Sequence, residues 1–229
     1  MLNKSNMYDW ITGTWNPVGG QCPHDCNYCY VKGFRFPSLK AKYSGMPRLI
    51  EHELKKNLGK DKFWFVGSCI DIFANEIPPR WKDKILYHCG KFNNRYLFQT
   101  KSPQYMLSCL DRFPFPKNTV LGTTIETNRI YPQMGKTPTP GNRAASMNTL
   151  RIGHEIMVTI EPIMNFDTDL FLRMISMCQP KWVNIGADSG GHNLPEPPAG
   201  KMRELIAELS KFTEVKPKKN LNRILKGEP

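Results

Sequence analysis

Strand-like and helix-like segments alternate along most of this chain, and this alternation restricts the possible folds more than any other feature. Apolar runs rich in β-branched and aromatic residues recur, and a segment with helical spacing usually follows each run. The five central runs are Phe63–Asp71, Arg95–Lys101, Thr119–Glu126, Glu155–Glu161 and Lys181–Asp188. The helical segments are Arg80–Phe92, Gln104–Arg112, Asn142–His154, Asp167–Met177 and Gly200–Phe212. Such alternation predicts a parallel sheet covered by helices.

The number of repeating units indicates which parallel fold to expect. A first strand within residues 1–15 and a last short run at Thr213–Lys216 complete about six strand–helix units, and a further helix is expected over Pro47–Leu58. The chain of 229 residues is shorter than a full eight-fold barrel of about 250 residues. We therefore predict an α/β fold, a partial (β/α)6 barrel of parallel strands with outer helices, or else an open α/β sheet. The domain is expected to span 1–216, with 217–229 as a basic C-terminal tail.

Three cysteines close to the N-terminus form the most specific chemical motif. Cys22, Cys26 and Cys29 follow the spacing C-x₃-C-x₂-C, and Gly19-Gly20 gives the preceding backbone the freedom to form a tight loop. Thiols at this density are metal or iron–sulfur ligands far more often than core residues. Three thiolates leave one iron of a 4Fe–4S cluster open to a small molecule. Two alternatives remain: His24 joins the thiols in a Cys₃His zinc site, or the loop binds no metal.

Polar residues follow the apolar runs at positions that share one strand face. Because side chains at i and i+2 point the same way, Thr159 and Glu161 lie opposite Val158 and Ile160. The same alternation places Gly122, Thr124 and Glu126 on one face, and Gly67, Cys69 and Asp71 on another. Parallel α/β folds bind ligands at the carboxyl ends of strands. These residues are therefore expected to line a shared polar cavity.

With the cysteine loop and the strand series together, the chain resembles the radical S-adenosylmethionine (SAM) superfamily. In detail it is similar to the spore photoproduct lyase family and to a related phage-borne family. The matching segments are Thr14–Pro17, Gly67–Phe73, Thr100–Lys101, Gly122–Glu126, Ile160–Pro162 and Gly186–Gly190. Two features depart from the superfamily pattern: the Gly-Gly-Glu triplet that usually meets the SAM amino group is missing, and Asp188 stands where Glu is expected.

The resemblance implies roles for individual residues. Cys22, Cys26 and Cys29 would ligate a 4Fe–4S cluster whose open iron binds SAM, and Tyr28 would lie over the cluster and offer backbone contacts to adenine. Lys101 and Thr124 would hold the SAM carboxylate, because a cation and a hydroxyl suit that group. Glu126 would accept hydrogen bonds from the ribose diol. For Lys101, Thr124 and Glu126, the alternative is that each lies at the rim of the cavity and binds no ligand.

The resemblance to the lyase also implies a cysteine that gives a hydrogen atom to a substrate radical. Cys69 is the candidate, since it falls on the polar face of the strand-like run Phe63–Asp71. A thiol is a suitable hydrogen-atom donor. The competing interpretation is a small core residue, because free cysteines are often buried.

Charge and composition suggest partners and a compartment. The net charge of +12 favours a polyanionic partner, so a nucleic acid or a nucleotide is the expected substrate. Arg129, Lys136 and Arg143 in the predicted loop 128–143, and the basic C-terminal tail, are candidate phosphate contacts. The remaining cysteines are widely scattered and no membrane-spanning run or signal peptide is present, which predicts a cytoplasmic protein with reduced thiols.

The sequence thus predicts a radical SAM enzyme that cleaves SAM reductively and abstracts hydrogen from its substrate, as in a lyase, repair or modification reaction. An electron donor such as flavodoxin or ferredoxin would serve it. Two other functions remain open: a non-catalytic zinc- or Fe–S-containing nucleic-acid-binding protein, and a superfamily member that keeps its cluster only as a scaffold.

Overall fold

A single parallel sheet organises the molecule. The computed structural model describes residues 7–110 and 112–227. Seven strands pair side by side in sequence order, all parallel. They are β1 (Gly13–Trp15), β4 (Phe63–Val66), β5 (Arg95–Thr100), β6 (Thr119–Thr124), β7 (Glu155–Ile160), β8 (Trp182–Ile185) and β9 (Glu214–Pro217). The predicted α/β class is confirmed.

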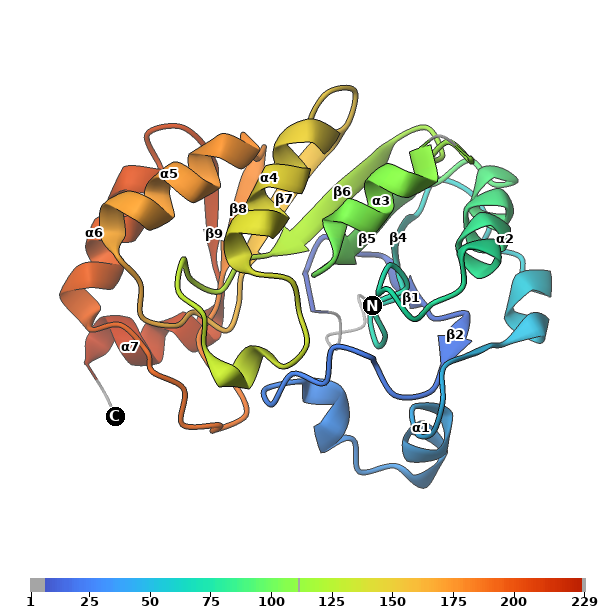
Figure 1. Cartoon of the computed structure of the whole chain (residues 1–229), viewed down its shortest axis with the longest axis horizontal. Helices are drawn as coiled ribbons and strands as arrows, with labels where there is room; N and C mark the ends of the chain where they lie inside the picture. Colours follow the sequence, from blue (N-terminus) through green and yellow to red (C-terminus); the bar gives the residue numbers. More distant parts are fainter. Residues whose placement is uncertain (1–6, 111, 228–229) are drawn as a thin grey trace.

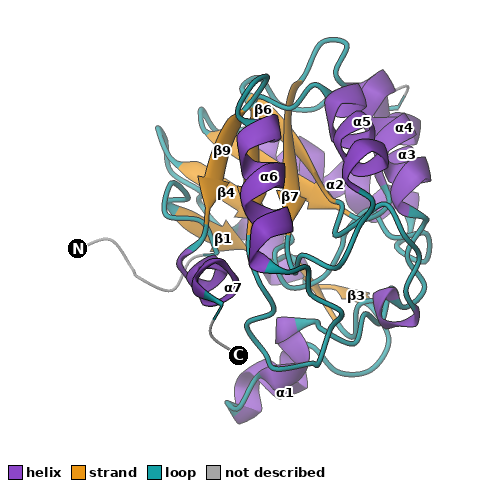
Figure 2. Cartoon of the chain, turned by 90° about the vertical axis from the view of Figure 1, so that its left-hand side faces the viewer, coloured by secondary structure: helices purple, strands orange, loops and turns teal. Residues whose placement is uncertain are grey.

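Helices cover the outer face of this sheet (Figures 1 and 2). Each strand from β4 onwards is followed by a helix, which gives the six predicted strand–helix units. The helices are α2 (Pro79–Gly90), α3 (Pro103–Leu110), α4 (Pro140–Leu150), α5 (Thr168–Cys178), α6 (Ala199–Leu209) and α7 (Asn222–Lys226). Within the described ranges, no pairing joins β9 back to β1, so the barrel is partial and open.

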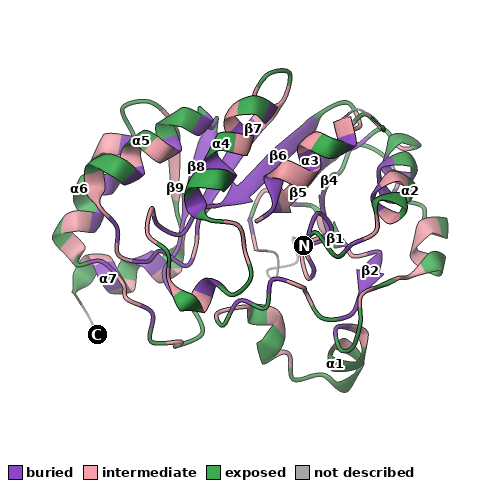
Figure 3. Ribbon diagram, viewed as in Figure 1, coloured by how far each residue is buried: buried purple, intermediate pink, exposed green. Residues whose placement is uncertain are grey.

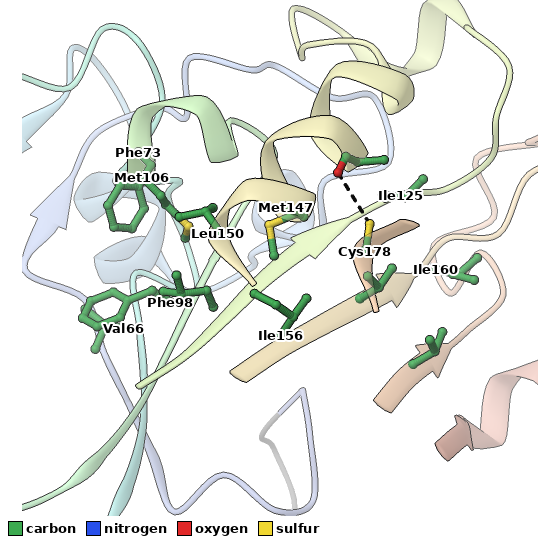
Figure 4. Close-up of a cluster of buried hydrophobic side chains, with 14 of the residues drawn as sticks. Val66, Phe73, Phe98, Met106, Ile125, Met147, Leu150, Ile156, Ile160 and Cys178 are labelled. Atoms are coloured by element: carbon green, nitrogen blue, oxygen red, sulfur yellow. Dashed lines mark hydrogen bonds between the residues drawn. The ribbon is translucent and has the colours of Figure 1, made fainter. Parts of the chain in front are cut away.

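The main hydrophobic core lies between the sheet and these helices. Period-2 alternation decides which strand residues enter it: Tyr96 and Phe98 of β5 face the helices, whereas Leu97 faces the other way. Figure 4 shows Phe98 of β5 beside Val66 of β4, and Ile156 of β7 beneath Met147 of α4. The helices therefore hold the sheet from one side and leave its inner face for other contacts.

The N-terminal segment fills part of that inner face. Tyr8 and Ile11 pack against Leu97 and Trp182, and the Tyr8 ring stacks on Trp10 with centroids 4.9 Å apart. Only Gly13–Trp15 of the predicted first strand is extended and paired, because the residues before it are used to cover the barrel interior.

Two predicted elements differ from the structure. A helix over Pro47–Leu58 is wrong: β3 (Arg48–Leu49) pairs antiparallel with β2 (Val18–Gly19), and only a 3₁₀ helix, Glu51–Lys55, follows. This pairing with Val18–Gly19, the segment that leads into the cysteine loop, overrides the helical spacing there. Part of the basic tail packs on the core: a 3₁₀ turn (Lys219–Leu221) and α7 bury Leu221 and Ile224, and 228–229 lie outside the described residues.

In the part of the chain that the structure describes, every helix is too short or too polar to cross a lipid bilayer.

Candidate functional site

A cavity of about 1260 Å³ opens at the carboxyl ends of the strands. The cysteine loop forms one wall, and the polar residues Gln99, Thr124, Thr159 and Glu161 come from successive strand ends. Val158 and Ile160 point instead into the helix-facing core, so the predicted alternation along β7 is confirmed. The alternation predicted beyond β4 does not hold, because Gly67, with φ at +76°, turns the chain away from the strand direction before Cys69 and Asp71.

All three motif cysteines line this cavity. Backbone hydrogen bonds of 3.2 Å, from Asp25 N to Cys22 O and from Cys29 N to Cys26 O, fold the loop into successive turns. Burial raises the pKa of the Cys22 thiol to about 12, the Asp71 carboxylate adds to this, and backbone N–H groups of Asp71 and His24 oppose it. A cationic centre at these sulfurs would oppose the rise in thiol pKa caused by burial and so favour the thiolates.

The donor set suits an iron–sulfur cluster. Cysteine thiolates are the usual ligands of such clusters, and the three motif cysteines reach one cavity. Among the described residues, no group of three or more His, Cys, Asp or Glu side chains is arranged to hold a single metal ion.

His24 is held by a carboxylate and does not lie free beside the thiols. Its Nε2 atom is 2.8 Å from Asp71 Oδ2, and both side chains are largely buried. Asp71 also accepts hydrogen bonds from Thr100 Oγ1 and Lys101 N, each 2.8 Å long. Burial alone raises the pKa of the Asp71 carboxyl, but the hydrogen bond and charge of His24 bring it below its ordinary value. The pair thus ties the cysteine loop to the ends of β4 and β5.

A second buried network fixes Tyr28. Its hydroxyl donates to Glu126 Oε1 over 2.6 Å and accepts from Lys101 Nζ over 2.8 Å. Glu126 is fully buried, and it forms ion pairs with Lys101 and with Arg143, the latter 2.7 Å from Oε2. Burial raises the pKa of this carboxyl, yet Arg143 and Lys101 lower it well below its usual range. Within the described ranges, Tyr28 and Lys101 line the cavity whereas Glu126 does not.

The loop between β6 and α4 closes over the cysteine loop. Asn27 N donates to Gln133 O over 2.9 Å, and Lys136 N donates to His24 O over 2.7 Å. Gly135 adopts φ of +67°, and a Cβ there would overlap the carbonyl oxygen of His24. This contact requires glycine, because both the backbone conformation and the space exclude a side chain.

Cys69 lies on the cavity wall beside two tyrosines. Its Sγ atom is 3.7 Å from the hydroxyl of Tyr30 and also interacts with Tyr43. The Phe34 ring bridges the two, with centroids 5.8 Å from each. Burial, together with the neighbouring thiol, raises the pKa of both tyrosine hydroxyls. Neither tyrosine was predicted as a partner of Cys69, although the aromatic density of residues 28–43 was a usable signal.

Thr124 and Asp188 also reach the cavity. The Thr124 hydroxyl accepts from Gln99 Nε2 over 3.0 Å. Asp188 is 2.6 Å from His192 Nδ1 and accepts from the backbone of Gly190 over 3.0 Å. The structure therefore brings together Cys22, Cys26, Cys29, Tyr28, Lys101, Thr124 and Cys69, and places Glu126 behind them.

Most of the predicted phosphate contacts are occupied by internal partners. Arg143 is fully buried against Glu126, which rules it out as a surface contact, and Arg129 is bound to both oxygens of Asp167. In the tail, Lys218 pairs with Glu161 and Arg223 with Glu196, each at 2.6 Å. These cations stabilise the fold's own carboxylates, and sequence spacing gave no sign of those distant partners.

Residues 5–202 match the family described as "Protein of unknown function (DUF5131)". The chain belongs to this family. No curated protein is similar enough in sequence to this DUF5131 member to count as a match.

Solved structures share its fold at low sequence identity. A cysteine-to-serine variant of spore photoproduct lyase aligns with a TM-score of 0.63 and 12% identity, over 88% of this chain and 75% of that one. A lyase variant with bound AdoMet and dinucleoside spore photoproduct gives 0.57 and 14%, over 87% of this chain. SuiB of Streptococcus suis, bound to S-adenosylmethionine, gives 0.54 and 9%, over 91% of this chain.

The DUF5131 chain spans 61% of the AdoMet-bound lyase and 51% of SuiB. At these identities the comparisons show the fold alone, which agrees with the partial barrel predicted from the alternating strands and helices.

Proposed function

We propose that this DUF5131 protein is a radical SAM enzyme. The observation that carries the proposal is that Cys22, Cys26 and Cys29 line one cavity with Lys101 and Thr124. When bound there, a 4Fe–4S cluster with SAM supplies one-electron cleavage of SAM and a 5′-deoxyadenosyl radical. Flavodoxin or ferredoxin would supply the electron.

The chain's own residues would bind and orient SAM. Lys101 Nζ and the Thr124 hydroxyl reach the cavity and would receive the SAM carboxylate. The Tyr28 backbone would meet adenine, while its side chain stays fixed by Glu126 and Lys101. Glu126 would accept from the ribose diol only after exchanging one of these internal partners. The cavity walls would exclude water from the reacting groups.

Cys69 would be the hydrogen-atom donor to a substrate radical. Its thiol lies on the cavity wall between the cysteine loop and the aromatic segment, where a substrate would enter. Tyr30 contacts the sulfur and would keep it in place during the transfer.

Anaerobic reconstitution with iron and sulfide, followed by dithionite and SAM, tests the reaction class. We expect 5′-deoxyadenosine from the wild type, and none from Cys26→Ala. Cys178→Ala removes a fully buried thiol of the helix layer and is the matched control, which should retain cluster and product. A cluster that forms in the wild type without any deoxyadenosine would overturn the catalytic proposal and favour the scaffold function.

The zinc-containing alternative makes a different prediction for His24. As a fourth ligand, His24 would be essential for metal retention, so His24→Ala would lose the metal. Our proposal expects His24→Ala to keep iron bound by three cysteines, with a less stable loop. Stoichiometric zinc and no iron–sulfur absorbance after reconstitution would contradict the proposed function.

A further inference from the structure

A basic and aromatic segment borders the mouth of the cavity. Residues 26–50 contain five Lys and Arg and no Asp or Glu, and five Tyr and Phe are interleaved with them. Their central part is a 3₁₀ helix (Tyr30–Gly33) and α1 (Pro37–Lys42), which project from the sheet and are exposed (Figures 1 and 3). We call residues 30–48 the basic lip.

Two of the five lip cations pair with carboxylates, Lys32 with Asp25 and Lys42 with Glu53, and the other three do not among the described residues. Among the described residues, no ion pair involves Arg35, Lys40 or Arg48, and both Arg35 and Lys40 are exposed. Arg48 donates only to backbone carbonyl groups. The cations of loop 128–143 and of the C-terminal region, by contrast, include Arg129, Arg143, Lys218 and Arg223, which bind carboxylates. The lip therefore presents charge that a polyanion can use.

The aromatic rings of the lip face the same cavity. Phe34, Tyr30 and Tyr43 form one continuous contact series next to Cys69. Phe36 lies at the rim and is 71% exposed, although large apolar side chains are usually buried. A ring in this position is available to stack on a flat heterocycle.

From this arrangement we propose that the lip binds single-stranded nucleic acid, with phosphates on Arg35 and Lys40 and an unpaired base on Phe36. Unpaired bases are required because a base within a duplex cannot reach aromatic side chains or the cavity beyond them. An acidic peptide would satisfy the cations but would leave the rings without partners. The proposal rests on the proposed function, since it identifies the substrate class for the same cavity.

Fluorescence anisotropy with the reconstituted full chain tests the lip directly, without SAM or reductant. The probe is a fluorescein-labelled single-stranded DNA of about 12 nucleotides, within the site size of single-strand binders. The variant is Arg35→Glu/Lys40→Glu. Its control, Lys117→Glu/Arg173→Glu, makes the same change in net charge at two exposed positions, in the turn before β6 and on α5.

We expect the lip variant to bind at least tenfold more weakly than the control variant. Its salt slope, log K against log salt, should fall in magnitude by about 1.4, or about 0.7 for each lost phosphate contact. Phe36→Ala should weaken binding about fivefold or more, with an unchanged salt slope. Ile152→Ala, which alters an equally exposed apolar residue elsewhere, should have no effect.

Three results would overturn the proposal: equal binding by the lip and control variants, equal affinity for the duplex of the same sequence, or equal affinity for a poly-glutamate of matched charge. The deoxyadenosine assay separates this failure from that of the proposed function. Deoxyadenosine without oligonucleotide binding refutes the lip alone, and oligonucleotide binding without deoxyadenosine refutes the radical chemistry alone.

Discussion

His24 Nε2 lies 2.8 Å from Asp71 Oδ2, so a histidine inside the cysteine motif is bonded to the segment that follows β4. The same carboxylate accepts hydrogen bonds from Thr100 Oγ1 and Lys101 N. Asp71 is therefore a junction that connects the cysteine loop with two strand ends.

Asp71→Ala should lower the free energy of unfolding of the metal-free protein by about 3–5 kcal/mol, because it leaves buried donors without their charged partner. Urea denaturation followed by tryptophan fluorescence measures this. Asp9→Ala, in an exposed turn, is the control and should change stability by about 0.5 kcal/mol or less. If Asp71→Ala lowered the free energy of unfolding no more than the control does, the hydrogen bonds at Asp71 would contribute little to stability.

Glu126 predicts a specific loss of stability in acid. Its folded-state pKa lies well below the ordinary 4.5, so its contribution is complete above pH 4.5 and is lost as the pH falls towards the folded-state value. Glu126→Gln should lower the free energy of unfolding by about 3–5 kcal/mol at neutral pH, since it leaves Arg143 buried without a counter-charge. It should also show a shallower decline of stability below pH 4.5 than the wild type.

Glu208→Gln provides the comparison for that experiment, because Glu208 of α6 forms an exposed ion pair with Lys211, just beyond the helix. Such pairs contribute about 0–1 kcal/mol. If the free energy of unfolding fell equally steeply below pH 4.5 in the wild type and in Glu126→Gln, Glu126 would not be the group responsible for the loss of stability in acid.

Gly135→Ala should destabilise the protein more than the same change at Gly191. The two glycines have nearly equal φ, +67° and +68°, so the backbone strain of an alanine is similar. Only at Gly135 does the new methyl group meet another chain segment, with Asp25 C at 2.9 Å. We expect an excess cost of about 1–3 kcal/mol in urea denaturation. Equal losses would show that the two loops separate easily.

Cys69 should be the thiol that alkylating reagents modify fastest in the cluster-loaded protein. It lines the cavity, whereas Cys89, Cys109 and Cys178 are fully buried and the motif cysteines would be engaged as ligands of the proposed cluster. Peptide mass spectrometry after brief iodoacetamide treatment measures the order of modification. Labelling of Cys178 before Cys69 would contradict the described packing.

The sequence predicted the fold where local periodicity and tertiary contacts agree. Thr159 and Val158 reach opposite faces of β7 as alternation requires, and the six strand–helix units are present. It failed at Pro47–Leu58, where pairing of Arg48–Leu49 with Val18–Gly19 overrides helical spacing.

Long-range pairs in the site were beyond the reach of sequence reasoning. Spacing identified the three cysteines, and the family resemblance added Lys101 and Thr124; all five line the cavity. No local pattern indicated that Arg143 would be buried against Glu126 instead of meeting phosphate, because such a pairing depends on where the fold brings α4.

The bond between Tyr28 and Glu126 joins residues 98 positions apart, and the loop that carries Gly135 lies further still along the chain. During synthesis the cysteines leave the ribosome long before these partners exist, since a chain emerges from its N-terminus. A nascent chain that ends before β6 therefore holds all three thiols, but it lacks both Glu126 and the loop that carries Gly135. For the cluster that we propose, delivery of iron and sulfide would therefore follow translation of the C-terminal half.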